Sequence, residues 1–281
     1  MASPTSDKRI SLKSLIPRSG HKVAGCVSHT DADDQLGGKV VTVTDPADGS
    51  IHLHWGHKGR KIEDGDEPKK LIFNTWDTKL RKGEFQRFED EPSYIHKLGH
   101  YGYEVHHVKF EQVLRWYLDT FTLTTTDSIF NPKTGMDIMT FIHLDKGEQY
   151  VDHHNFFLAS GEGTRRDVHH ASFEVDDVDS ELKGHNYLKK KGWSLVLGVG
   201  RHLLGSQICD YWFDNDGFVL EHYADGDMVN NKNPPQRIAA GPESVAIGAL
   251  RSRLGSSRGD MRTWGFSPFS RKGAQAGRLL K

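Results

Sequence analysis

The stretch GVGRHLLGSQICDYWFDNDGFVLEHYADGD, residues 198–227, decides how the rest of the chain is interpreted. Two runs of apolar and aromatic residues, QICDYWF and GFVLEHYA, flank a turn of Asp, Asn and Gly, which predicts two strands joined by a tight turn. Because side chains alternate along a strand, Glu221 shares a face with Val219 and Tyr223. A carboxylate on such an apolar face needs a partner, and a metal cation is one such partner.

Upstream of this stretch, a first mixed unit begins at Lys97. The run KLGHYGYEVHHV predicts a strand, and TLTTTDSIF, MDIMTFIHLD and HHNFFLASG predict three more. Between them, FEQVLRWYLDTF predicts a helix, because five apolar side chains fall on one helical face: Phe110, Val113, Leu114, Tyr117 and Leu118. The order is β-α-β-β-β.

The same order repeats in a second unit. VHHASFEV predicts a strand, and DDVDSELKGHNYLKKKG predicts a helix that Asp176 or Asp177 caps and Gly192 ends. SLVLGVG, SQICDYWF and GFVLEHYA complete it as strands. Neither unit could bury its sheet alone. We therefore expect an α+β fold in which tandem βαβββ modules form a cupped half-barrel site.

These units lie between two less regular segments. Residues 1–92 are expected to hold a partial N-terminal module, irregular up to about residue 36, with a closing hairpin near 37–56 and then a charged connection that can include a short helix. Residues 93–235 are expected to form the catalytic domain. Residues 236–281 are expected to form a basic, disordered tail.

The composition excludes some classes of protein. A formal net charge of −1 over 281 residues provides no general field to attract nucleic acid or a membrane surface. With no apolar run of membrane-spanning length and no secretory signal in the first ten residues, we expect a cytoplasmic protein. The two cysteines, Cys26 and Cys209, are expected to be reduced. The 17 histidines stand out, because histidine is the commonest metal ligand.

Superposing the two units singles out three residues. His100 and His170 open the first strands of the first and second units, and Glu221 lies on the last strand of the second. Taken alone, each has an ordinary structural interpretation, such as a strand histidine or a salt-bridge partner. Together, two histidines and one carboxylate form the ligand set of non-haem Fe(II) oxygenases, which leaves coordination positions open.

Five motifs carry a family resemblance: KLGHYGYEV, HHNFFLA, VHHASFEV, GVGRH and DYWFDNDGFVLEHY. From Lys97 to Asp227, nearly half of its length, the chain resembles the catalytic module of the type I extradiol ring-cleaving dioxygenases. These enzymes belong to the vicinal oxygen chelate, or glyoxalase–bleomycin resistance, superfamily. The resemblance is strongest to members similar to catechol 2,3-dioxygenase and trihydroxytoluene oxygenase.

The resemblance implies roles for particular residues. His100, His170 and Glu221 would bind Fe(II), with Mn(II) as the alternative. His154 would be the acid/base histidine, and His153 remains open because the alignment there could slip by one residue. The resemblance further implies that the substrate hydroxyls are bound by His202 and Tyr211, which would also act in catalysis. Strand alternation predicts that His169 points away from His170.

The implied activity is cleavage of the aromatic ring of a substituted catechol next to its diol, with incorporation of O2. The implied partners are a catechol and O2, in a homo-oligomer. Two alternatives stay open: a relative left inert by its shortened first module, and a glyoxalase-like isomerase or lyase. His202 and Tyr211 favour ring cleavage, because they have no evident purpose in a glyoxalase.

Other residues near the motifs have less certain roles. Arg201 could bind a substrate carboxylate, or equally support a neighbouring carboxylate or backbone carbonyl. Four aromatic residues are expected to line a pocket for an aromatic guest: Phe141, Phe156, Phe173 and Trp212.

Overall fold

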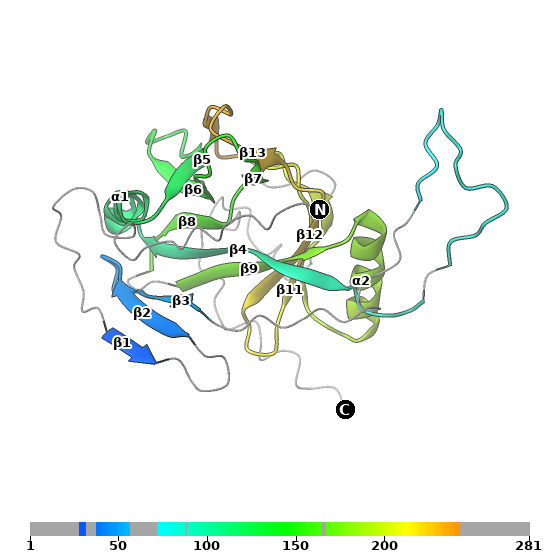
Figure 1. The fold of residues 1–281 in the computed structure, drawn as a ribbon, viewed down its shortest axis with the longest axis horizontal. Helices are drawn as coiled ribbons and strands as arrows, with labels where there is room; N and C mark the ends of the chain where they lie inside the picture. The colour runs from blue at the N-terminus through cyan, green and yellow to red at the C-terminus, as the bar shows by residue number, and fades with distance from the viewer. Residues whose placement is uncertain (1–27, 32–37, 57–71, 88, 164–166, 242–281) are drawn as a thin grey trace, which may run out of the picture.

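A computed structural model describes residues 28–31, 38–56, 72–87, 89–163 and 167–241 (Figure 1). Both βαβββ units form as the sequence predicts. The first comprises β4 (Ile95–His106), α1 (Phe110–Thr120), β5 (Leu123–Phe130), β6 (Asp137–Leu144) and β8 (Phe156–Gly161). The second comprises β9 (Asp167–Val175), α2 (Val178–Lys190), β10 (Leu195–Arg201), β11 (Ile208–Phe213) and β12 (Val219–Ala224). A short 3-10 turn, η2 (His107–Lys109), precedes α1, and β7 (Val151–Asp152) precedes β8.

The two units share one nine-stranded sheet of order β10-β11-β12-β9-β4-β8-β6-β5-β14, in which β14 is Gln236–Ala239. In each unit the first strand pairs in parallel with the last, β4 with β8 and β9 with β12. The antiparallel pair of β4 and β9 then joins the units edge to edge. The first strands of both units therefore lie side by side at the centre of the sheet, next to β12 (Figure 1).

The helix α1 packs on the sheet through its predicted apolar face. Phe110, Val113, Leu114 and Tyr117 are buried against Tyr103, Val105, Ile142 and Leu158, and Leu118 is partly buried at the edge of this cluster. Burying a large apolar side chain of this kind contributes about 1.5–3 kcal/mol. This core fixes β4, which carries His100, and β8, which His154 precedes by two residues.

Helix α2 covers the second unit and keeps its predicted ends. The side chain of Asp177, not Asp176, accepts a hydrogen bond of 2.8 Å from the backbone N–H of Ser180. Gly192 follows the helix with a φ of +80°, a conformation that favours glycine. The sequence left the choice of cap open between two adjacent aspartates, and the extended backbone of Asp177 decides it.

Three N-terminal strands form a separate small sheet: β1 (Ser28–Asp31), β2 (Lys39–Thr44) and β3 (Ser50–Trp55). The hairpin of β2 and β3 was predicted, whereas β1 lies in a segment predicted to be irregular, and that prediction was wrong there. The buried Asp45 anchors the hairpin to the first unit, because its Oδ2 accepts hydrogen bonds from the hydroxyls of Tyr103 (2.7 Å) and Tyr117 (3.3 Å).

One further segment differs from the sequence prediction, and the charged connection is described only in part, since residues 57–71 lie outside the described residues. Residues 72–87 form no helix and extend as an arm beyond α2 (Figure 1). Residues 236–281, predicted as a disordered tail, begin with β14, which pairs in parallel with β5, and β13 (Met228–Val229) lies shortly before them. The sheet thus continues to Ala239, whereas the sequence predicts the end of the catalytic domain at residue 235. Residues 1–27 and the tail beyond residue 241 lie outside the described residues.

Among the described residues, neither helix is long and apolar enough to cross a membrane.

Candidate metal centre

Three adjacent central strands bring the predicted ligands together. His100 comes from β4, His170 from β9 and Glu221 from β12. All three residues are buried, with 3%, 7% and 0% of their surface exposed. Because strand order places β4, β9 and β12 side by side, residues separated by up to 121 positions meet on one face of the sheet.

The ligand atoms form a compact triangle. Glu221 Oε2 lies 2.9 Å from His100 Nε2 and 3.3 Å from His170 Nε2, and the two Nε2 atoms are 3.2 Å apart. Two donors held at about 2.1 Å from one ion, at right angles, lie about 3.0 Å apart. The triangle therefore fits one face of a divalent cation with other positions open.

The local electrostatics also fit a cation. Within the described residues, Glu221 Oε2 is buried without a hydrogen bond of normal geometry. Burial by itself would raise the pKa of Glu221, but the neighbouring His100, His170 and His202 outweigh it and hold this pKa well below its usual value. Burial lowers the pKa of His170 despite its contact with Glu221. An ionised carboxylate and a neutral imidazole are the forms that bind a metal.

His154 lies directly beside this triangle. Its ring is buried, 4.1 Å from the ring of His100 and 4.9 Å from the ring of Phe141. Burial, reinforced by His100 and His153, places its pKa well below the usual value. His153 instead pairs with Asp127, with its Nε2 2.8 Å from Asp127 Oδ2. The geometry thus favours His154 over His153 as the histidine facing the ligands.

His202 and Tyr211 lie on the other side of Glu221. His202 Nε2 is 2.8 Å from the Tyr211 hydroxyl and 3.4 Å from Glu221 Oε1, and the Tyr211 ring is 5.3 Å from that of His170. Tyr211 is the direct cross-strand partner of Glu221 between β11 and β12. Burial raises the pKa of Tyr211 well above its usual value, so its hydroxyl stays protonated. The structure therefore brings all six predicted site residues together.

The comparison with family models decides the affiliation of this domain. Residues 97–222 match the model described as "Glyoxalase/Bleomycin resistance protein/Dioxygenase superfamily". Residues 97–222 belong to this superfamily. The match covers nearly all of both βαβββ units and includes His100, His170 and Glu221.

One curated relative and two solved structures are similar to this chain. Metapyrocatechase 2 from Cupriavidus necator is 32% identical over 119 residues, which is 42% of this chain and 34% of that protein. The chain thus spans about a third of the length of this relative. The Mn(II)-bound glyoxalase from Novosphingobium aromaticivorans aligns with a TM-score of 0.60 and 17% identity, over 82% of this chain and 64% of the other.

A second solved structure gives the same fold. Homoprotocatechuate 2,3-dioxygenase from Brevibacterium fuscum, in an anaerobic complex with 3,4-dihydroxyphenylacetate, aligns with a TM-score of 0.60 and 15% identity, over 79% of this chain and 61% of the other. At this identity the likeness establishes the fold alone. The superfamily fold thus carries both a glyoxalase and a dioxygenase with equal TM-scores.

One orientation within the superfamily domain was predicted wrongly. His169 was expected on the face opposite His170, yet their Nδ1 atoms are 2.9 Å apart and both rings contact Phe157. The register of β4 against β9 shifts between Gly102 and Tyr103, opposite this pair. A β-bulge interrupts the alternation of side chains, and a shift of this kind has no local sequence signal here. His169 therefore orients the ring of His170.

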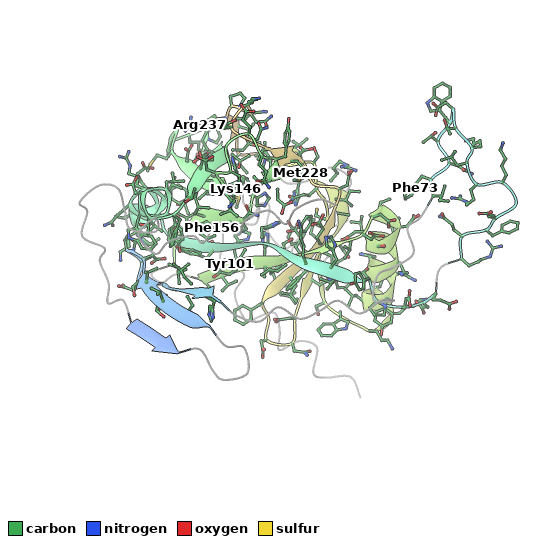
Figure 2. All side chains as sticks on the ribbon, viewed as in Figure 1. Phe73, Tyr101, Lys146, Phe156, Met228 and Arg237 are labelled. Atoms are coloured by element: carbon green, nitrogen blue, oxygen red, sulfur yellow. The ribbon has the colours of Figure 1, made fainter. Side chains whose placement is uncertain are left out.

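Three of the four aromatic residues expected in the pocket lie elsewhere. Phe173 pairs with His222 in the register of β9 and β12, on the face opposite Glu221. Phe156 packs against Tyr101 (Figure 2) and against Tyr117, in the core beneath α1. Trp212 donates its Nε1–H to Asp210 at 2.6 Å, on the side of β11 that α2 covers. Alternation along β11 explains this position, because Tyr211 faces the site.

The sequence also missed two residues at the site, and the structure narrows the role of a third. Asp127 could not be identified from sequence because it reaches His153 from β5, which is separated from β9 by three intervening strands. Cys209 joins His202 and Glu221 in a second group whose potential ligand atoms lie within 4.8 Å of one another. Arg201 bonds the carbonyl oxygen of Ser206 and Asp225 Oδ2 (2.9 Å), which is the supporting role of the two alternatives.

Proposed function

We propose that this chain is a non-haem metal-dependent extradiol dioxygenase that cleaves the ring of a substituted catechol next to the diol, with incorporation of O2. One observation carries the proposal: the buried triangle of His100, His170 and Glu221 has His154 on one side and the bonded pair of His202 and Tyr211 on the other. The 32% identity to metapyrocatechase 2 supports it.

His100, His170 and Glu221 would hold the cation, which we propose to be Fe(II), with Mn(II) as the alternative. The three donors fit either ion, since imidazole and carboxylate suit both. When bound, the ion supplies Lewis acidity toward the catechol hydroxyls and electron transfer toward O2. The surrounding side chains must bind, orient and deprotonate the substrate.

The pair of His202 and Tyr211 provides the substrate contacts. The 2.8 Å bond between His202 Nε2 and the Tyr211 hydroxyl holds both polar groups at the edge of the triangle. A catechol oxygen placed there can accept a hydrogen bond from the Tyr211 hydroxyl while the ring is aligned against the ligands. Both side chains are largely removed from solvent, which strengthens such a bond.

His154 serves as the acid/base residue. Its ring is 4.1 Å from that of His100 and is not itself part of the triangle. An imidazole next to the reacting atoms can take a proton from a substrate hydroxyl at Nε2 and return it later in the cycle. The apolar contact with Phe141 excludes water from this side.

Two other functions share part of this evidence. The glyoxalase aligns as well as the dioxygenase, so an isomerase or lyase is compatible with the fold. The chain spans 34% of metapyrocatechase 2, which keeps an inert metal-binding relative as the other alternative. The hydrogen-bonded pair of His202 and Tyr211 favours ring cleavage. We also keep the homo-oligomer as a prediction.

The test is oxygen uptake by anaerobically purified protein that has been reconstituted with Fe(II) and offered a panel of substituted catechols. We expect O2 consumption with a yellow ring-opened product, lost in the Glu221→Ala and His154→Ala variants. His222→Gln is the matched control, because alternation along β12 turns His222 away from the face of Glu221. Full metal loading without O2 uptake would favour the inert relative, and absence of metal binding would refute the triangle as a ligand set.

A further inference from the structure

Two pairs of consecutive histidines in this domain make the same kind of contact within each pair. In each pair the Nδ1 atoms face each other, at 3.0 Å for His153 and His154 and at 2.9 Å for His169 and His170. Between two neutral imidazoles, one Nδ1 must carry the proton and the other must accept it. Each pair therefore couples the proton position on one ring to that on the other. The second pair continues to Glu221, within the triangle itself (His170 Nε2 to Oε2, 3.3 Å), whereas the first pair continues to a carboxylate outside the triangle.

That carboxylate is Asp127, which is 6% exposed on β5. Its Oδ2 lies 2.8 Å from His153 Nε2, and its Oδ1 accepts a hydrogen bond of 2.8 Å from the backbone N–H of Gln236. An ionised carboxylate can only accept, so His153 carries a proton on Nε2. When His153 is neutral, its Nδ1 is then the acceptor and His154 Nδ1–H is the donor. His154 Nε2 is consequently the bare nitrogen.

The surroundings hold His153 in this orientation. Its carbonyl accepts a hydrogen bond of 2.6 Å from the Thr126 hydroxyl, which in turn is 2.6 Å from His143 Nδ1. Its backbone N–H donates to the carbonyl of Asp227 at 3.0 Å. Gly205, with a φ of +76°, leaves space for the ring, since a Cβ there would lie 3.0 Å from it. The titratable or charged groups around the ring are thus Asp127, His154 and His143.

We propose that Asp127, His153 and His154 form a proton relay in which His153, rather than His154, stores the substrate proton. The inference rests on the proposed ring-cleaving function. A catechol O–H bond breaks, its electron pair stays on oxygen, and the proton forms a new bond to His154 Nε2. The His154 Nδ1–H bond then breaks and its proton passes to His153 Nδ1. His154 ends neutral, and the His153 imidazolium is paired with Asp127.

The relay solves a problem set by the position of His154. A charge on this buried ring would lie 4.1 Å from the ring of His100, and among the described residues the one hydrogen bond of the His154 ring goes to His153 rather than to a carboxylate. Moving the proton to His153 places the positive charge next to the carboxylate of Asp127, which compensates a buried cation. The proton returns along the same path when a product oxygen must be protonated. In this scheme Asp127 and His153 are positioning residues, because neither touches the substrate.

The test counts the protons released when Mn(II)-loaded protein binds 4-nitrocatechol without O2, by calorimetry in buffers of different ionisation enthalpy. We expect wild type to retain the substrate proton. Asp127→Asn and His153→Gln, which keep hydrogen-bonding side chains, should release about one more proton per ligand. His185→Gln is the matched control, because it alters a partly buried His–Asp pair between α2 and β11 (His185 Nδ1 to Asp210, 3.0 Å). Its proton count should equal that of wild type.

A second measurement needs no variant. Nitrogen NMR of ¹⁵N-histidine-labelled, metal-free protein should show the proton of His154 on Nδ1 and that of His153 on Nε2. Equal proton counts in wild type and both relay variants, or His154 protonated on Nε2 in the neutral state, would overturn the relay. If wild type fails to bind 4-nitrocatechol at all, the proposed function fails and the relay has no substrate. Binding with equal counts removes the relay alone.

Discussion

Replacing Glu181 with glutamine should stabilise the fold at pH 8 and change its stability little at pH 5. Glu181 lies on α2 with 1% of its surface exposed, and within the described residues neither carboxylate oxygen has a hydrogen-bond partner. Burial, together with the charges of Asp210 and Glu221, raises the pKa of Glu181 from 4.5 to about 9. The protein therefore folds around a protonated carboxyl group.

The sign of the effect follows from the two pKa values of Glu181. Its folded-state pKa exceeds that of the unfolded chain, so the stability associated with the protonated form is fully present below about pH 4.5 and is lost progressively up to about pH 9. Each unit corresponds to about 1.4 kcal/mol, which sets an upper bound of about 5 kcal/mol at pH 8. Because the glutamine amide is also buried without a partner, we expect a net gain of about 1–3 kcal/mol.

Urea denaturation of wild type and Glu181→Gln at pH 5 and pH 8 measures this difference. Glu111→Gln on α1 is the matched control, because the side chain of Glu111 is 64% exposed and the substitution should leave the pH dependence unchanged. Glu181→Met removes the polar group and should give a gain of the same sign at pH 8. A difference between wild type and Glu181→Gln that is equal at both pH values would refute the assignment of a protonated Glu181.

Three other substitutions test the packing and the site. Asp45→Ala should lower the free energy of unfolding by about 2–4 kcal/mol, because two buried tyrosine hydroxyls lose their acceptor; chemical denaturation measures it, and a loss below about 0.5 kcal/mol would contradict the anchoring role. Gly102→Ala places a Cβ 1.9 Å from the Phe157 ring and should cost about 1–3 kcal/mol and weaken metal binding, seen by thermal unfolding and Mn(II) titration; unchanged values would show that the ring moves freely. Tyr211→Phe should raise the catechol KM about tenfold while metal loading stays complete, in steady-state kinetics with metal analysis, and an unchanged KM would remove Tyr211 from the substrate contacts.

Local sequence signals predicted most of the fold. The 3.6-residue period of Phe110, Val113 and Tyr117 defines α1, and the cap and glycine at the ends of α2 are short-range features. The three proposed ligands could be found because each lies at an equivalent or complementary position of two repeated units. Strand alternation predicts that the consecutive residues Tyr211 and Trp212 point to opposite faces of β11, although both were assigned to the site from the sequence.

The features that could not be predicted depend on contacts between distant strands. The bulge that turns His169 toward His170 arises from the register of β9 against β4. Asp127 reaches His153 because the order of the sheet brings β5 near the segment before β8. The parallel pairing of β14 with β5 likewise joins residues more than 100 positions apart. For example, the backbone N–H of Gln236 donates to Asp127, which lies 109 positions earlier in the sequence. Short-range composition alone predicts neither register nor strand order.

The most direct test of ring cleavage by this site is the fate of isotopically labelled oxygen. Fe(II)-reconstituted protein would react with a catechol it consumes under ¹⁸O2, and the product would be analysed by mass spectrometry. The proposed function predicts a ring-opened product with ¹⁸O in its new carboxylate, and no such product from Glu221→Ala. A ring-opened product without ¹⁸O, or an intact ring after full metal loading, would contradict it.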